Sequence, residues 1–138
     1  MNQKLTNTLL CLLTLLCLGC GSDEPKQTST GLIQQINAGG IITDAQAKSL
    51  RYTDDLELNG LTSITDAQAE SLSNLWHLNL NGLTSITDKQ AESLSNNTSF
   101  AELNDLTSIT DAQAESLSKV RELYISEDLQ PLIDKYNK

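Results

Sequence analysis

A unit of about 22 residues is copied along most of this chain, which makes it a repeat sequence. The segment 61–73 is identical to 106–118, and 83–95 differs from both only at Lys89. The triplet Ile-Thr-Asp recurs at 42–44, 64–66, 86–88 and 109–111, so the last step is one position longer than the others. A short, regular period indicates a repeat architecture, in which each unit buries its apolar side chains against its neighbours.

The apolar spacing changes within each unit. Leu78 and Leu80 alternate with polar residues, as in a short half-buried strand, and the equivalent pairs are Leu56/Leu58, Ala101/Leu103 and Leu123/Ile125. After the triplet the spacing becomes three, as in Ala91 and Leu94, which fits one face of a short helix. Each unit therefore predicts a strand, a turn and a helix.

Two details of the unit concern its turns. Gly60 and Gly82 come just after the predicted strand, where a turn is needed, and Asp105 takes this place in the next copy. The extra residue of the longer last step falls within 96–100, which we expect to be a loop.

The start of each predicted helix carries a capping signal. Thr65 and Gln68 have the spacing of a capping box, in which each side chain accepts a hydrogen bond from the other residue's backbone N–H. Ile64 can pack on Ala69, and Asp66 lies where the helix dipole favours a negative charge. The same Thr and Gln recur at Thr43/Gln46, Thr87/Gln90 and Thr110/Gln113. Helices this short need caps and neighbours to be stable in water.

This unit resembles a leucine-rich repeat over the segment 39–128. It is most similar to the cysteine-containing subtype, with Leu61, Leu83 and Leu106 in place of the Cys. The resemblance implies an α/β fold, a short solenoid of about four to five strand-turn-helix units with parallel strands on one face. A repeat of helical hairpins is the alternative, although the unit is short for two helices and a turn.

The segments that flank the repeats are predicted to cover its ends. Leu32, Ile33 and Ile36 have helical spacing before Gly39 and Gly40, so the segment 31–38 predicts an N-terminal cap helix. The segment 129–138 predicts a C-terminal cap, with inward side chains at Leu129, Leu132 and Ile133.

The segment before the cap helix is typical of a targeting signal and is not expected to be part of the folded domain. Lys4 precedes an apolar run at 9–18, which is shorter than the ~20 residues of a membrane span, so the segment 1–19 predicts a signal peptide. The end of this segment, Cys-Leu-Gly-Cys at 17–20, resembles a bacterial lipobox, which implies lipidation of Cys20. An ordinary signal peptide with an incidental Cys is the alternative. The segment 20–30 then predicts the lipidated Cys and a flexible tether.

The net charge and the absence of known catalytic motifs limit the functions that the sequence predicts. The net charge of −9 argues against a nucleic-acid partner, which would require basic patches. We expect no catalytic residues, no metal site and no cofactor, because no nucleophile-and-base set occurs and His77 is the only His. Carboxylates four positions apart, such as Asp66 and Glu70, predict a solvated acidic helix face, with weak divalent-cation binding as the alternative.

Variation between the copies is concentrated on the predicted strands. The strand positions expected to face away from the core differ from unit to unit, and we expect partner binding there, at Asp55, Glu57, His77, Asn79, Phe100, Glu102, Glu122 and Tyr124. The sequence thus predicts a non-catalytic protein-interaction module of the bacterial cell envelope, anchored by lipid at the outer membrane, the periplasmic face or the extracellular surface. Its partner would be an envelope or extracellular protein. A structural spacer without a specific ligand is the alternative.

Overall fold

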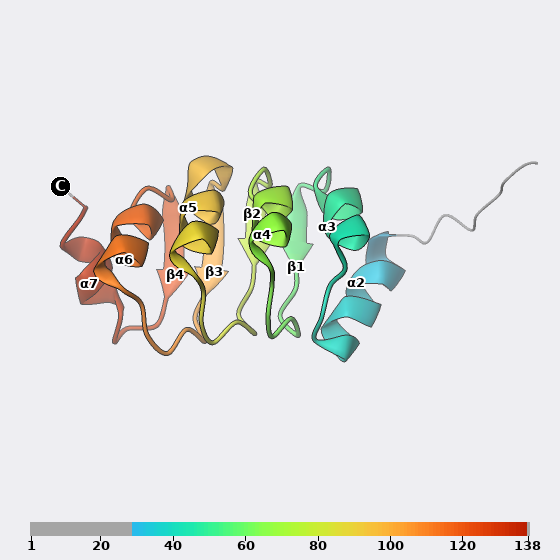
Figure 1. The fold of residues 1–138 in the computed structure, drawn as a ribbon, viewed down its shortest axis with the longest axis horizontal. Coiled ribbons are helices and arrows are strands. Elements are labelled where there is room, and N and C mark those ends of the chain that lie inside the picture. Colours follow the sequence, from blue (N-terminus) through green and yellow to red (C-terminus); the bar gives the residue numbers. More distant parts are fainter. Residues whose placement is uncertain (1–28, 138) are drawn as a thin grey trace, which may run out of the picture.

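The structure is a computed structural model that describes residues 29–137. It is mixed α/β, with four strands in one all-parallel sheet of order β1-β2-β3-β4 (Figure 1). The described elements, in chain order, are α2 (Ser29–Gly39), α3 (Asp44–Leu50), β1 (Asp55–Glu57), α4 (Asp66–Leu72), β2 (His77–Asn79), α5 (Asp88–Asn97), β3 (Phe100–Leu103), α6 (Asp111–Leu117), β4 (Glu122–Ile125) and α7 (Gln130–Asp134). The predicted α/β class and parallel strands are confirmed.

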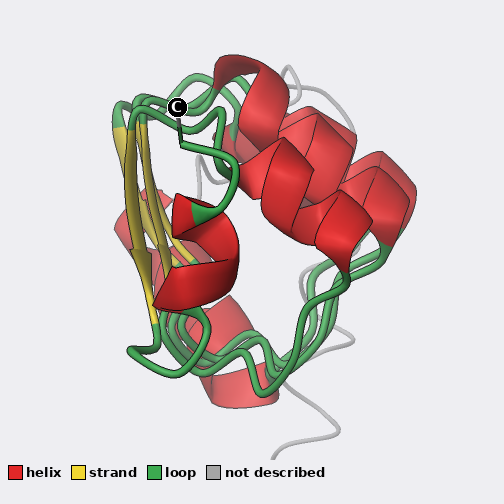
Figure 2. Ribbon diagram, turned by 90° about the vertical axis from the view of Figure 1, so that its left-hand side faces the viewer, coloured by secondary structure: helices red, strands yellow, loops and turns green. Residues whose placement is uncertain are grey.

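The strands lie on one side of the molecule and helices α3 to α6 on the other, with the apolar core between them (Figure 2). Each strand pairs with the next along the chain, and helices α3 to α6 each contact the following helix. The alternating strand residues Leu56, Leu58, Leu78 and Leu80 are at most 1% exposed, and the helix residues Ala69, Leu72, Ala91 and Leu94 meet them in the same core. No unit has enough apolar surface to form a core alone, so this shared burial holds the units together.

All four predicted capping boxes are present. In each, the Thr side chain accepts from the Gln backbone N–H, and the Gln side-chain oxygen accepts from the Thr backbone N–H, at Thr43/Gln46, Thr65/Gln68, Thr87/Gln90 and Thr110/Gln113. The cap satisfies backbone donors that such a short helix would otherwise leave unpaired.

The glutamines also connect neighbouring units, which the sequence did not reveal. The Nε2 of Gln68 donates to the carbonyl oxygen of Ile42 at 2.8 Å, and Gln90 and Gln113 donate to Ile64 at 2.8 Å and Ile86 at 3.0 Å. We call these three bonds the glutamine ladder. All three glutamines are buried, so the ladder satisfies polar groups that would be costly to leave unpaired.

The two turn glycines are required for a reason different from the predicted one. Gly40 has the single positive φ among the described glycines, so Gly60 and Gly82 do not serve a left-handed turn. A Cβ on Gly60 would lie 2.0 Å from the Asn37 carbonyl oxygen, and one on Gly82 would lie 2.5 Å from that of Asn59. Close approach of the preceding segment therefore selects glycine at both positions.

The sequence predicts a loop for the extra residue of the longer last step, but the structure shows a longer helix instead. Helix α5 runs from Asp88 to Asn97 and is longer than α4 and α6, so it absorbs the insertion. Thr98 follows it and is buried, with its hydroxyl donating to the Ser73 carbonyl oxygen at 3.1 Å. The strands keep their pairing across this unit.

Both ends of the described chain carry a covering helix. Helix α2 begins at Ser29, two positions before the predicted cap helix, so it includes the last part of the segment assigned to the tether. Helix α7 places Ile133 in the core, and Leu129 just before it is also buried. The predicted signal peptide and Cys20 lie outside the described residues.

Candidate functional site on the strand face

The parallel register arranges the outward strand side chains in two rows. One row contains Asp55, His77, Phe100 and Glu122, and the other contains Glu57, Asn79, Glu102 and Tyr124. Together these eight residues form the strand-face cluster. All the residues predicted for partner binding therefore lie on one surface, because strands about 4.8 Å apart bring equivalent positions side by side.

Three rings form the middle of the strand-face cluster. The His77 and Phe100 ring centroids lie 4.3 Å apart with the planes at 87°, an edge-to-face arrangement. The Phe100 and Tyr124 centroids lie 4.9 Å apart with the planes at 35°. His77 and Phe100 are half-buried, whereas Tyr124 remains 52% exposed. The set of rings therefore ends in an aromatic side chain that a partner can reach.

Glu102 is held in place by two amides. Its Oε2 accepts from Asn79 Nδ2 at 2.6 Å and from Asn81 Nδ2 at 3.0 Å. Asn79 also accepts from the Asn81 backbone N–H at 3.1 Å, and it is only 8% exposed. Asn79 lies in a row predicted to bind a partner, but its hydrogen bonds and neighbours bury it.

His77 lies between two carboxylates. Its Nδ1 is 3.2 Å from Asp55 Oδ1, and its Nε2 is 3.6 Å from Glu102 Oε1, too far for a hydrogen bond. The Nε2 atom is buried and lacks a hydrogen-bond partner among the described residues. The Glu102 carboxylate therefore lies near the His77 ring but does not orient it by a direct hydrogen bond.

The rim of the strand-face cluster is acidic. Asp55, Glu57 and Glu122 are exposed around the three rings. Exposed carboxylates beside an aromatic face can hold a Lys or Arg side chain by charge and by cation–π attraction. The described residues contain no group of three or more His, Cys, Asp or Glu side chains placed to hold a metal ion.

The aspartates of the helix side are already engaged by the structure. Asp44 accepts from Gln68 at 2.9 Å, Asp66 from the Thr87 hydroxyl at 2.9 Å, and Asp88 from the Thr110 hydroxyl at 3.0 Å. Each bond joins one unit to the next. The helix-side aspartates therefore stabilise the stacking of units in addition to facing solvent.

Lys135 continues this pattern at the C-terminal end. Its Nζ donates to Asp111 Oδ1 at 3.0 Å. This hydrogen bond and the Lys135 charge lower the pKa of Asp111, and the bond to Asp111, with a smaller effect from Tyr136, raises the pKa of Lys135. An ion pair thus takes the place that a neutral donor occupies in the other units.

Sequence reasoning missed two sets of residues that shape the molecule. Asn81, which orients Glu102, was not among the predicted binding residues. The glutamine ladder was missed because the capping box already explained the recurring glutamines, although the sequence contains a signal for it. A capping box accepts Glu as well as Gln, yet all four copies have Gln, the residue that can also donate.

Comparisons with known proteins leave the chain without a family assignment. No protein-family model matches it, and comparison with curated proteins gave no match. No solved structure matches it either. Within residues 29–137, none of the helices combines the length and apolar character needed to cross a membrane.

Proposed function

We propose that this chain is a leucine-rich-repeat-like solenoid that binds a protein partner through the strand-face cluster. In this proposal a lipid on Cys20 anchors the protein in the bacterial cell envelope. The chain has no catalytic activity. One observation carries the proposal. Residues copied between units engage neighbouring units, whereas the outward strand residues differ and gather into one aromatic and acidic surface.

The solenoid part of the proposal rests on how the units contact each other. Strands β1 to β3 each pair with the strand of the following unit, and the glutamine ladder joins the starts of α4, α5 and α6 to the unit before. Contacts limited to nearest neighbours are the defining property of repeat proteins.

The chemistry of the strand-face cluster favours a partner with basic side chains. Its exposed rim supplies Asp55, Glu57 and Glu122, and the exposed ring of Tyr124 lies beside them. A net charge of −9 would also attract a basic partner at long range. We therefore expect the bound surface to present Lys or Arg, with Tyr124 as the main aromatic contact.

Crosslinking and affinity capture from the native envelope test this function. Tyr124→Ala should abolish capture of the partner, whereas Tyr52→Ala should not, because Tyr52 is an exposed tyrosine outside the cluster. Glu57→Lys should likewise abolish capture, with Glu92→Lys on the helix side as its matched control. Circular dichroism should show all four variants folded. Equal capture by the Tyr124 and Tyr52 variants would refute binding at this surface.

Two further measurements test the lipid anchor and the alternative role as a structural spacer. Cys20→Ala should move the protein from the membrane to the soluble fraction, and continued membrane retention would count against the lipid anchor. A spacer would tolerate both strand-face substitutions but lose function when one unit is added or removed. That result would favour the structural alternative over partner binding.

A further inference from the structure

Strand β4 is an open edge of the sheet. The backbone N–H of Glu122 donates to the Ser99 carbonyl oxygen at 2.9 Å, so Glu122 and Tyr124 direct their main-chain groups toward β3. Main-chain groups alternate in direction along a strand, so those of Arg121, Leu123 and Ile125 point away from the sheet. No described strand lies beyond β4. An edge of this kind is a template for another strand.

The opposite edge of the sheet is occupied. Asn37 of α2 donates from Nδ2 to the Glu57 carbonyl oxygen at 3.0 Å and accepts at Oδ1 from the Gly60 N–H at 3.0 Å. These bonds satisfy main-chain groups at the end of β1. Helix α2 is thus bonded directly to the main chain at the β1 edge, which makes β4 the more accessible edge for pairing between copies.

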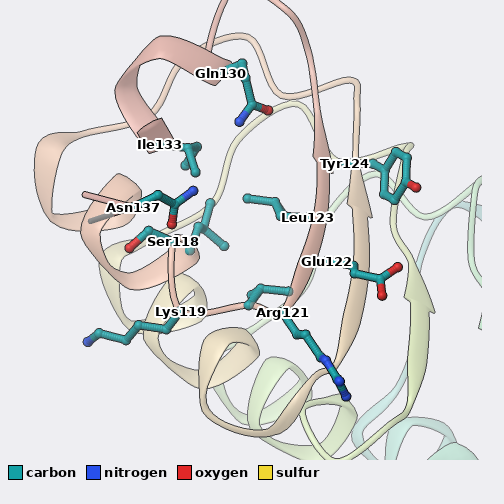
Figure 3. Close-up of a pocket in the computed structure, with 11 residues that line it drawn as sticks. Ser118, Lys119, Arg121, Glu122, Leu123, Tyr124, Gln130, Ile133 and Asn137 are labelled. Carbon is teal, nitrogen blue, oxygen red and sulfur yellow. The ribbon is translucent and has the colours of Figure 1, made fainter. Parts of the chain in front are cut away.

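A groove separates the open edge from helix α7. It has a volume of about 560 Å³, with Leu123 on the β4 side and Ile133 and Asn137 on the side of α7 (Figure 3). The row of inward residues is incomplete here. Leu56, Leu78 and Ala101 are 0%, 1% and 3% exposed, whereas Leu123, the last in the row, is only half-buried. One more strand would bury it.

The charges along β4 are ordered. Lys119 and Arg121 precede the strand, and Glu127 and Asp128 follow it, with all four side chains exposed. Two copies of β4 that run antiparallel would therefore bring the basic end of each against the acidic end of the other. A parallel arrangement would oppose like charges at both ends. This order selects a second copy of the same chain, in one direction, as the occupant of the edge.

We propose that β4 pairs antiparallel with β4 of a second copy and forms a two-fold symmetric dimer. Leu123 lies opposite the partner's Leu123, and the basic residues before each strand approach the acidic residues after the other. Residues directly opposite in this register exchange backbone hydrogen bonds, and an antiparallel pair at the edge of a parallel sheet is common. The two strand-face clusters would then join into one surface. This inference does not depend on the partner binding proposed above.

Sedimentation of the purified full chain in detergent over a concentration series tests this dimer. The variant Lys119→Glu with Arg121→Glu has two acidic ends, and the variant Glu127→Lys with Asp128→Lys has two basic ends. Each should bind its own copies about tenfold more weakly or worse, because like charges meet. An equal mixture of the two variants should restore the dimer as a heterodimer. The pair Glu70→Lys and Glu92→Lys on the helix side is the control and should leave dimerisation unchanged.

Three results would overturn the proposal. One is a wild-type chain that remains monomeric over the whole series. Another is a dimer that neither charge variant weakens, because the interface would then lie elsewhere. The last is a mixture of the two variants that fails to associate while circular dichroism shows both folded. For a chain that stays monomeric, capture of a different protein at this edge would identify the occupant that takes the place of a second copy.

Discussion

The helix side and the strand side are built from the same units but use their polar side chains differently. On the helix side, Gln68, Gln90 and Gln113 make the same hydrogen bond to the preceding unit. On the strand side, equivalent positions hold Asp55, His77, Phe100 and Glu122, and each contact is of a different kind. Residues recur where every neighbour needs the same contact, and they vary where none does.

Asn79 and Asn81 are exceptions to this difference between the two sides. Both lie on the strand side, yet they are used internally to orient Glu102. Variation between copies is therefore necessary for a recognition surface but does not by itself expose a residue. Four experiments test this difference between the two sides of the molecule.

The largest effect is expected at the turn that joins the two sides. Gly60→Ala should lower the free energy of unfolding by about 3 kcal/mol, because the new Cβ would lie 2.0 Å from a backbone oxygen that cannot easily move. Urea denaturation measures the change. Gly39→Ala is the control and should be neutral or stabilising, since nothing lies within 4 Å of its Cβ position. Equal tolerance of both changes would show that this approach is not close.

A smaller effect should separate the glutamine ladder from the capping box. Gln90→Glu keeps an acceptor for the Thr87 N–H but places a carboxylate against the Ile64 carbonyl oxygen. We expect a loss of about 1–3 kcal/mol in the free energy of unfolding, because the partly buried Ile64 carbonyl oxygen loses its donor and faces a carboxylate. Glu92→Gln, on the exposed side of the same helix, should change it by less than about 0.5 kcal/mol. A similar small change for both would mean that the cap alone explains why Gln is copied.

On the strand side the expected energies are smaller still. A double-mutant cycle of Phe100→Leu and Tyr124→Ala should give a coupling energy of about 0.5–1.5 kcal/mol, the usual range for an aromatic pair. The same cycle with Asp55→Ala and Tyr124→Ala should give a coupling near zero, because three strand spacings separate these residues. A coupling above about 3 kcal/mol, the top of the range for contacting residues, would make the rings part of the core rather than a recognition surface.

The smallest effect should come from the ion pair at the C-terminal end. Lys135→Gln should lower stability slightly across the neutral range and leave it nearly unchanged at both pH extremes, so the dependence of stability on pH becomes flatter. With Lys135 present, the lowered pKa of Asp111 adds stability above its ordinary value of 3.8, which is lost as the pH falls through the lowered pKa. The raised pKa of Lys135 adds stability below 10.5, which is lost as the pH rises through the raised pKa.

Thermal unfolding across the pH range measures this contribution. Lys89→Gln removes the same charge from an exposed helix position and should leave the shape of the profile unchanged. If both variants change the profile equally, overall charge and not the Asp111 pair sets the dependence at the extremes.

The local structure was predictable because its causes lie close together in the chain. The capping box of Thr65 and Gln68 spans three positions, and the alternation of Leu78 and Leu80 spans two, so a single unit contains the whole signal. The mixed α/β class and the parallel strands follow from repeating such a unit. The alignment of the eight candidate site residues in two rows was predictable for the same reason, since equivalent positions of parallel strands lie side by side.

What the sequence did not reveal depends on contacts between units. The bond from Gln90 to Ile64 and the approach of Asn37 to Gly60 each join positions more than a full unit apart. Neither contact appears in the pattern of one unit. The burial of Asn79 likewise depends on Glu102 of the neighbouring strand. Spacing therefore predicts which residues share a face, but the chemistry of their neighbours decides which of them stay exposed.

The lengthened helix α5 has a consequence for how such a chain can change. The added residue is taken up by the helix, and His77 still pairs with Phe100 across the strands. The insertion at the end of this helix thus leaves the register of the strands on the opposite surface intact. Mutation can therefore alter the length of a unit and the composition of its strand independently of each other.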